Sequence, residues 1–435
     1  MDGQELYKKG KKLIPGGTQL LSKRPEMFLP DLWPAYYAKA KGVKVTDLAG
    51  ITYTDMSIMG VGACILGYAD PDVDRAVIAA LRNGVQCTLN APEEVELAEL
   101  LCSLHPWANM VRYARSGGEA MAVAVRIARA HTGKDIIAFC GYHGWYDWYL
   151  AANISEDHAL DGHLMPGLEP SGVPRGLLGS ALPFHYNHIE QLEEIVARNN
   201  GRIAAIVMEP RRDQTPEPGF LEKVKKIARE QDAVLVFDEI TTGFRMCPGG
   251  IHQTLGVNPD IAVFAKAMSN GYAMAAVVGT AEVMESAQST FISSTNWTER
   301  IGPAAALATI RKYQEKHVDD HIISIGNSVM VGWQNAADEA GLPVHISGLS
   351  TLNHFSIEGD EKLEMATLFT QIMLEKRYLA YTQFKPSFAH TKKHIDAYIS
   401  VTKDAFSRIA DAHKKGSVRS LLKGSPQRSG FYRLT

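Results

Sequence analysis

The sequence predicts an α/β protein, with a mostly parallel sheet in a large domain and a smaller α+β domain. From about Pro71, amphipathic helical patterns alternate with short apolar runs rich in β-branched residues, which is typical of parallel strands joined by crossover helices. After Ile301, helical patterns dominate and strand patterns are few. The helical patterns cover 71–83, 93–104, 119–131, 188–198 and 219–231, and the strand patterns cover 111–115, 135–140, 203–208, 233–238, 261–265 and 275–279.

These patterns predict three parts. We expect an N-terminal segment over 1–60 that packs with the small domain, a large domain over 61–315 and a C-terminal small domain over 316–435. Within the N-terminal segment, alternating residues around a turn built on Asp47 and Gly50 predict a hairpin.

Composition and charge exclude several classes of partner. A formal net charge of −3 gives no support for binding nucleic acid or a membrane surface. No apolar run approaches the length that spans a bilayer, and the first residues lack the pattern of a signal peptide. The five cysteines are scattered and form no Cys-x-x-Cys pair, so we expect reduced thiols in a cytoplasmic protein. No His or Cys spacing indicates a metal site.

Two charged residues follow buried strands in the middle of the chain. The run 234–237 leads to Asp238, and the run 261–265 leads to Lys266. Ligands of open α/β sheets bind outside the carboxyl ends of the strands. Alone, such an Asp is more often a helix cap or ion-pair partner, and such a Lys is usually a solvated strand end. Together they match one chemistry: a lysine that forms a Schiff base with pyridoxal phosphate (PLP), with a carboxylate partner for the pyridinium nitrogen.

The wider string resembles a known family. Val-Leu-Val-Phe-Asp-Glu-Ile-Thr-Thr-Gly-Phe-Arg over 234–245, then Pro259-Asp260, Lys266 and Gly271, is similar to the signature of class III (ω-type) aminotransferases. The glutamate-1-semialdehyde 2,1-aminomutase branch is nearest. The resemblance runs from about Ile14 to His390 and implies the PLP-dependent transferase fold type I, with Lys266 and Asp238 as catalytic residues.

Ser116, Gly117 and Gly118 join a predicted strand to a predicted helix. Free N–H groups at a helix N-terminus suit a phosphate, although turns of this kind are common. The resemblance to the family's Ser-Gly-x-Glu-Ala string implies that these residues bind the cofactor phosphate. Gly118 stands where many relatives carry Thr, so one hydroxyl contact is absent.

Aromatic and apolar residues are expected to enclose the cofactor ring. The string Tyr142-His143-Gly144 resembles the family's Tyr-His-Gly, which implies that Tyr142 stacks on one ring face. Ile240 lies two residues after Asp238, on the same side of an extended chain, and is expected to cover the other face. His143 either contacts the cofactor or supports the loop. A surface aromatic cluster is the competing interpretation.

Charged residues follow the strand over 203–208. Glu209 resembles the family's strand-end Glu near the cofactor, and a capping role is equally consistent with the sequence. Arg211 and Arg212 suggest a site for an anionic substrate group, because guanidinium binds carboxylate or phosphate in a bidentate way. A solvated charge pair is the alternative.

The segment before the Ala-rich helix carries the last candidates. Its alignment implies that Thr295 binds the cofactor phosphate of a neighbouring subunit, which predicts a homodimer with shared active sites. Trp297 and Arg300 depart from the family's Gly-Asn-Pro continuation and are expected to line the substrate pocket.

The cofactor residues match the family, whereas the substrate residues of the aminomutase do not. Leu20, Lys23 and Thr382 stand where the family has Ser, Arg and Glu. We therefore expect an aminotransferase that moves an amino group from an amino-acid donor to a carbonyl acceptor, with a sugar or another specialised metabolite as candidate acceptors. A 2,1-aminomutase or a PLP-dependent lyase is the alternative. A non-catalytic PLP-fold protein would have lost Lys266 or Asp238.

Overall fold

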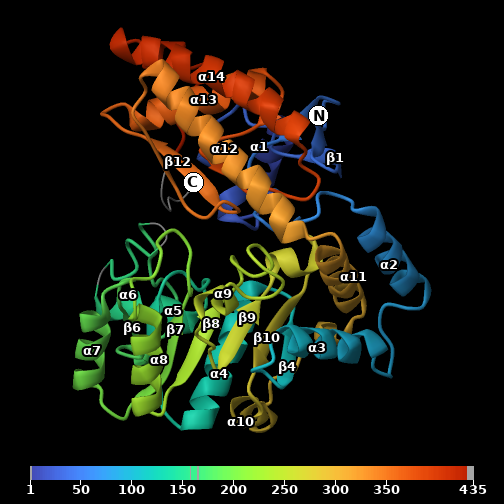
Figure 1. Ribbon diagram of the computed structural model, residues 1–435, viewed down its shortest axis with the longest axis vertical. Coiled ribbons are helices and arrows are strands. Elements are labelled where there is room, and N and C mark those ends of the chain that lie inside the picture. Colours follow the sequence, from blue (N-terminus) through green and yellow to red (C-terminus); the bar gives the residue numbers. More distant parts are fainter. Residues whose placement is uncertain (1, 157, 164–165, 429–435) are drawn as a thin grey trace. The chain divides into compact units, whose positions relative to one another are not determined.

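The chain forms two compact units. One comprises Pro71–Lys316, and the other comprises Met1–Asp70 together with His317–Thr435. The computed structural model describes residues 2–156, 158–163 and 166–428, and each unit is shown in Figure 1. These boundaries lie within about ten residues of the expected divisions at 60/61 and 315/316.

The larger unit is built on a seven-stranded sheet in the order β4-β10-β9-β8-β7-β5-β6 (Figure 1). Its only antiparallel pairs are those of β10 with β4 and with β9, and the other neighbours are parallel. The strands are β4 Met110–Ala114, β5 Ile136–Cys140, β6 Ala181–Pro183, β7 Ile203–Met208, β8 Val234–Asp238, β9 Ile261–Phe264 and β10 Ala275–Gly279. The predicted mostly parallel sheet is confirmed.

Helices cover both faces of this sheet. Alternate strand residues point to opposite faces, so Phe139, Val207 and Val236 pack in one cluster with α4, while Ile206 and Leu235 pack in another with α7 and α8. The helices are α2 Pro71–Arg82, α3 Pro92–Leu104, α4 Gly117–Thr132, α5 Asp147–Leu150, α6 Ala152–Ser155, α7 Ile189–Arg198, α8 Phe220–Glu230, α9 His252–Leu255, α10 Ala281–Met284 and α11 Ile301–Glu315. The 3-10 turns of the larger unit are η3 Arg175–Leu177, η4 Lys266–Ser269, η5 Glu285–Ser289 and η6 Thr295–Thr298.

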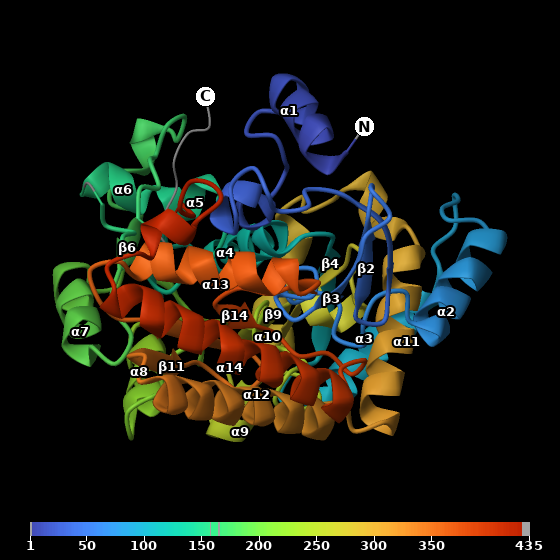
Figure 2. The ribbon, with the colours of Figure 1, turned by 90° about the horizontal axis from the view of Figure 1, so that it is seen from above.

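The smaller unit contains three longer helices, α12 Val318–Ala340, α13 Lys362–Glu375 and α14 Lys392–Lys414, which lie side by side in Figure 2. They pack on a sheet of β11 Val344–Ser347, β12 Asn353–Ile357 and β14 Gln383–Phe384. A second sheet joins β1 Tyr37–Lys41, β2 Lys44–Asp47, β3 Thr52–Asp55 and β13 Tyr378–Leu379. The remaining elements are α1 Gly3–Leu13, η1 Leu21–Lys23, η2 Pro25–Met27 and η7 Arg419–Leu421.

The predicted hairpin is confirmed as β2 and β3. Lys44 pairs with Thr54, and the Asp47 carboxylate closes the turn by accepting the N–H groups of Ala49 and Ile51. Because β13 pairs with β3, residues near the start of the chain belong to the same sheet as residues near 378. Among the helices in the described ranges, none is long and apolar enough to cross a membrane.

Candidate active site

Asp238 and Lys266 stand at the ends of two neighbouring parallel strands. Asp238 is the last residue of β8 and lies opposite Val263 of β9, and Lys266 begins η4, one residue after the end of β9. The Lys266 backbone has φ of 47°, in the left-handed region that a side chain disfavours. Strain of this kind persists only where the surrounding structure fixes it, and it is often found at functional sites. The fold therefore holds this lysine in one place.

The Lys266 amine is set up as a nucleophile. Nζ donates a hydrogen bond to Thr241 Oγ1 at 2.9 Å. The pKa of Lys266 is lowered to about 8, mainly by burial and also by the nearby charges of Arg212 and Arg245, while the carboxylates of Asp238 and Glu209 act in the opposite direction. Burial disfavours the charged form of an amine, and the neutral form is the one that attacks a carbonyl.

Asp238 is held on both carboxylate oxygens. Oδ1 accepts the Ile240 N–H at 3.0 Å, and Oδ2 lies 2.8 Å from His143 Nδ1. The His143 Nε2 donates to the Cys140 carbonyl at 3.0 Å, because a carbonyl oxygen only accepts. His143 and Asp238 are both buried, so their contact fixes the carboxylate where water cannot compete.

In the first turn of α4 the backbone passes close to the side chains of Ile240 and Tyr146. Ser116 caps the helix, and Glu119 completes a capping box by accepting the Ser116 N–H at 3.4 Å. A Cβ on Gly117 would lie 2.9 Å from Ile240 Cδ1, and a Cβ on Gly118 would lie 3.3 Å from the Tyr146 ring. The absence of side chains at these two positions lets the chain pass close to Ile240 and Tyr146 without displacing them. The N–H groups that begin the helix are suited to an anion such as phosphate.

Tyr142 lies near the carboxylates of both Asp238 and Glu209. Burial raises the pKa of Tyr142, and the charge of Asp238 raises it further, which places the phenol within reach of that charge. Glu209 follows β7 and is buried. A Cβ on Gly141 would lie 2.9 Å from its Oε2, so the glycine makes room for the carboxylate. The structure thus brings together the predicted residues Ser116, Gly117, Tyr142, His143, Glu209, Asp238, Ile240 and Lys266 at one edge of the sheet.

The two neighbouring arginines diverge. Arg212 Nη1 lies 3.4 Å from Glu209 Oε2, and its charge acts on Lys266. Arg211 Nη2 instead donates to Thr215 Oγ1 at 3.2 Å, within the loop. Arg212 therefore belongs to the surroundings of Lys266, and Arg211 belongs to the loop.

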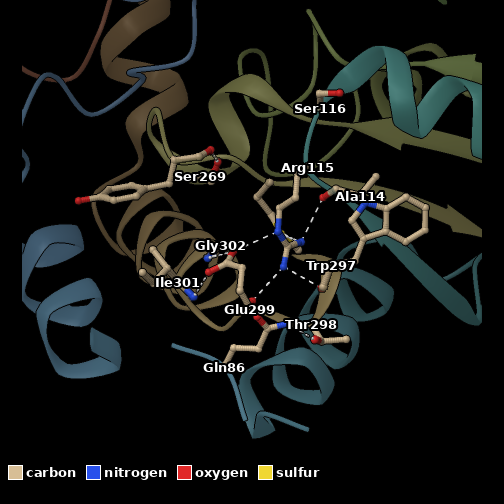
Figure 3. Close-up of polar contacts among 12 residues, drawn as sticks. Gln86, Ala114, Arg115, Ser116, Ser269, Trp297, Thr298, Glu299, Ile301 and Gly302 are labelled. Carbon is tan, nitrogen blue, oxygen red and sulfur yellow. Dashed lines mark hydrogen bonds and ion pairs between the residues drawn. The ribbon is translucent and has the colours of Figure 1, made fainter. Parts of the chain in front are cut away.

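An arginine beside the helix turn holds the segment that carries Thr295 (Figure 3). Arg115 Nη2 donates to the carbonyls of Trp297 at 2.7 Å and Glu299 at 2.9 Å, and its Nε pairs with Glu299 Oε1 at 3.0 Å. Gln86 Nε2 donates to the Thr295 carbonyl at 2.7 Å, while Thr295 itself is exposed. Within this chain, no contact brings the described Thr295 to Lys266.

Arg300 has a structural partner. Its Nη2 lies 2.6 Å from Glu93 Oε1 on α3, and both side chains are largely buried. Removing either charge would leave the other buried and unpaired. The substrate roles expected for Trp297 and Arg300 stay predictions, and the ion pair with Glu93 gives Arg300 a role in packing.

Two residues of the site were not singled out from the sequence. Thr241 accepts from Lys266, and Arg245 is almost fully buried while its Nε donates to the Thr241 carbonyl at 2.6 Å. Both lie in the string over 234–245 that carries the resemblance. The signal was therefore present, but the pattern alone did not separate residues that contact the lysine from residues that only shape the turn.

Comparison with known proteins identifies the family. The family described as Aminotransferase class-III matches residues 30–406. The 3-aminobutyryl-CoA aminotransferase of Cloacimonas acidaminovorans is 31% identical over 423 residues, which cover 94% of this chain and 97% of that protein. A glutamate-1-semialdehyde 2,1-aminomutase of Syntrophobacter fumaroxidans is 30% identical over 429 residues, which cover 93% and 97%.

Solved structures agree with this result. An omega-transaminase from Sphaerobacter thermophilus superposes with a TM-score of 0.83 at 25% identity, covering 94% of this chain and 98% of that one. The PLP internal aldimine form of FumI from Sphingopyxis sp. MTA144 superposes with a TM-score of 0.86 at 23% identity, covering 98% and 99%. The predicted resemblance and fold type I are confirmed. The chain belongs to the class III aminotransferases, a family of PLP-dependent enzymes.

Proposed function

We propose that this enzyme moves an amino group from an amino-acid donor to a carbonyl acceptor, with PLP held covalently on Lys266. The observation that carries the proposal is the pairing of two strand-end residues: an amine with a lowered pKa and a carboxylate fixed by His143. Burying an amine or a carboxylate costs free energy because the charged form loses its water. Together the two residues provide an amine that can bind PLP covalently and a carboxylate that can keep its ring nitrogen protonated.

The residues present fit this cofactor. The glycine-rich first turn of α4 offers N–H groups to the phosphate, and Tyr142 and Ile240 would flank the ring. Asp238, paired with His143, would hold the ring nitrogen protonated. When bound, PLP supplies an electrophilic carbon and accepts the electrons released as the substrate Cα loses its proton.

Lys266 performs two tasks in this scheme. Its Nζ would hold the cofactor covalently, which requires the neutral amine. Displaced by the amine of the donor, Nζ would move a proton from the donor Cα to the former aldehyde carbon of the cofactor, and with the acceptor bound it would move a proton from that carbon to the acceptor carbon. Thr241 Oγ1, 2.9 Å away, orients the amine for both tasks. Glu209 would hold the ring from the side of β7, beside Gly141.

A donor screen tests the proposal. Purified enzyme is mixed with single amino acids, and both pyridoxamine phosphate and the matching keto acid are measured. An aminotransferase yields both in equal amounts. The second candidate function is that of a 2,1-aminomutase or a lyase, and the observation in its support is the 30% identity to an aminomutase. Such an enzyme would rearrange or eliminate its substrate, and no keto acid would be formed in amounts equal to pyridoxamine phosphate. That result would replace the proposal.

The lowered pKa of Lys266 predicts how cofactor uptake depends on pH. The neutral amine fraction rises as pH passes through the folded pKa of about 8, instead of the ordinary 10.5. We therefore expect the rate of PLP incorporation into cofactor-free protein to rise between about pH 7 and 9 and then to level off. Absorbance of the bound cofactor measures it. A rate that still rises tenfold per unit near about pH 10 would contradict the lowered pKa.

We further infer a homodimer with shared sites in the cytoplasm. Thr295 is exposed on η6, and a residue must be exposed to contact a second subunit. Gln86 and Arg115 hold the segment that contains Thr295 in place. All five cysteines are free thiols, which supports a reducing compartment.

Mixing two inactive variants tests the shared site. In a hybrid of Lys266→Ala with Thr295→Glu, one site combines an intact Lys266 with the partner subunit's intact Thr295. Random mixing should restore about a quarter of the wild-type activity, because half of the dimers are hybrids with one complete site of two. Light scattering checks the assembly. A monomer, or no recovery despite proven subunit exchange, would rule out the shared site.

A further inference from the structure

A cavity of about 220 Å³ opens at the carboxyl ends of β5, β6 and β7. Its walls include Gly141, His163, His185, Tyr186, Glu209 and Arg212. Glu209 and Arg212 belong at the same time to the surroundings of Lys266, since the charges of both act on its amine. The cavity therefore adjoins the surroundings of Lys266.

The Arg212 guanidinium has N–H donors beyond those that contact Glu209. In the described part of the chain its hydrogen bonds run only from Nη1 to the two Glu209 oxygens, at 3.4 and 3.5 Å. Charge-assisted pairs are shorter, about 2.7–2.9 Å, so this pair is loose. A guanidinium has five N–H donors in a planar fork and can serve two carboxylates at once. The Glu209 charge raises the pKa of Arg212, which keeps the guanidinium charged.

His163 supplies a second donor to the same cavity. Its Nδ1 accepts the Gly141 N–H at 3.2 Å, so the proton of the neutral ring is on Nε2. Burial lowers the pKa of His163 to about 4, so the ring is neutral near pH 7. This Nε2 is buried and has no hydrogen-bond partner among the described residues. A buried donor without an acceptor is costly, and a ligand oxygen would satisfy it.

We propose that Arg212 and His163 bind a carboxylate group of the amino donor or acceptor in this cavity. The inference rests on the proposed function and names the substrate class of that site. Glu209 holds the guanidinium from one side and leaves Nη2 and Nε for the ligand. Glu209 and Asp213 also line the cavity, so a singly charged carboxylate is favoured over a doubly charged phosphate. Arg211 does not line the cavity, and its Nη2 donates to Thr215.

Binding of unreactive carboxylates to the holoenzyme tests this assignment. Acetate, glutarate and adipate lack an amine and a ketone, so calorimetry measures recognition without turnover. For the best of the three, Arg212→Gln should weaken binding at least about tenfold and His163→Phe about threefold or more. Arg211→Gln is the matched control, one residue away, and should change the affinity less than about twofold. Inorganic phosphate should bind more weakly than that carboxylate.

Several results would overturn the assignment. These are a wild type that binds none of the three carboxylates, an Arg212→Gln variant with unchanged affinity, or an equal loss in Arg211→Gln. The PLP content of every variant, measured by absorbance, shows whether the site is intact. Failure of the proposed function would look different: wild-type protein would carry no PLP on Lys266, or would release no keto acid, whatever its affinity for carboxylates.

Discussion

Replacing Lys266 with alanine is expected to lower the rate of amino transfer at least about 10⁴-fold, because one side chain supplies both the covalent attachment and the proton transfer. The variant should still bind PLP through the α4 turn and Asp238, but without a covalent bond. Borohydride reduction followed by mass spectrometry should fix the cofactor on the peptide containing Lys266 in the wild type and on no peptide in the variant.

Lys225 offers a control for this experiment. It lies on α8, and burial also lowers its pKa, but it has no place at the strand ends. Lys225→Ala should keep near wild-type activity and the adduct on Lys266. An adduct on another lysine of the wild type, or substantial turnover in Lys266→Ala, would show that Lys266 is not the attachment site.

The second large effect is expected for Asp238→Asn. An amide cannot hold a pyridinium proton by charge, and it leaves the buried His143 without its anionic partner. Removing the charged partner of a buried polar group costs roughly 3–5 kcal/mol, which corresponds to about a 10³-fold fall in rate when the whole loss falls on the transition state. Steady-state kinetics together with the PLP content separate this loss from a loss of cofactor.

His143→Gln should give a smaller fall than Asp238→Asn. Its amide can still donate to Asp238 Oδ2, but it lacks the rigid ring that also reaches the Cys140 carbonyl. We expect a fall of about tenfold, with PLP still bound. If Asp238→Asn turns over at nearly the wild-type rate, another residue must hold the ring nitrogen. If His143→Gln is as slow as Asp238→Asn, the histidine does more than position the carboxylate.

The sequence was sufficient for the sheet because its strands are short, apolar and β-branched. The runs over 203–208 and 233–238 coincide with β7 and β8 to within one residue. The three-residue strand β6 was not predicted, since it is too short to show a period and contains Pro183. Asp238 and Lys266 could be found from sequence because each directly follows such a run.

Side-chain directions could not be predicted in the same way. His143 was left with two roles, and only the distance of 2.8 Å to Asp238 shows that it supports the carboxylate. Arg211 and Arg212 are adjacent in an irregular loop, where no period fixes which side chain faces the strand ends. The contact between Arg115 and Glu299 joins residues 184 positions apart, and such pairs leave no local pattern.

Arg115 contacts both the first turn of α4 and the segment over 297–299. Its own N–H is bound by Glu119 in the first turn of α4, and its guanidinium holds the carbonyls of Trp297 and Glu299. The same residue therefore positions the turn proposed to bind the cofactor phosphate and the exposed segment proposed to contact a neighbouring chain. In the proposed dimer the turn belongs to one phosphate pocket and the segment to the pocket of the neighbouring chain, so a displacement at one pocket would reach the other through the Arg115 side chain.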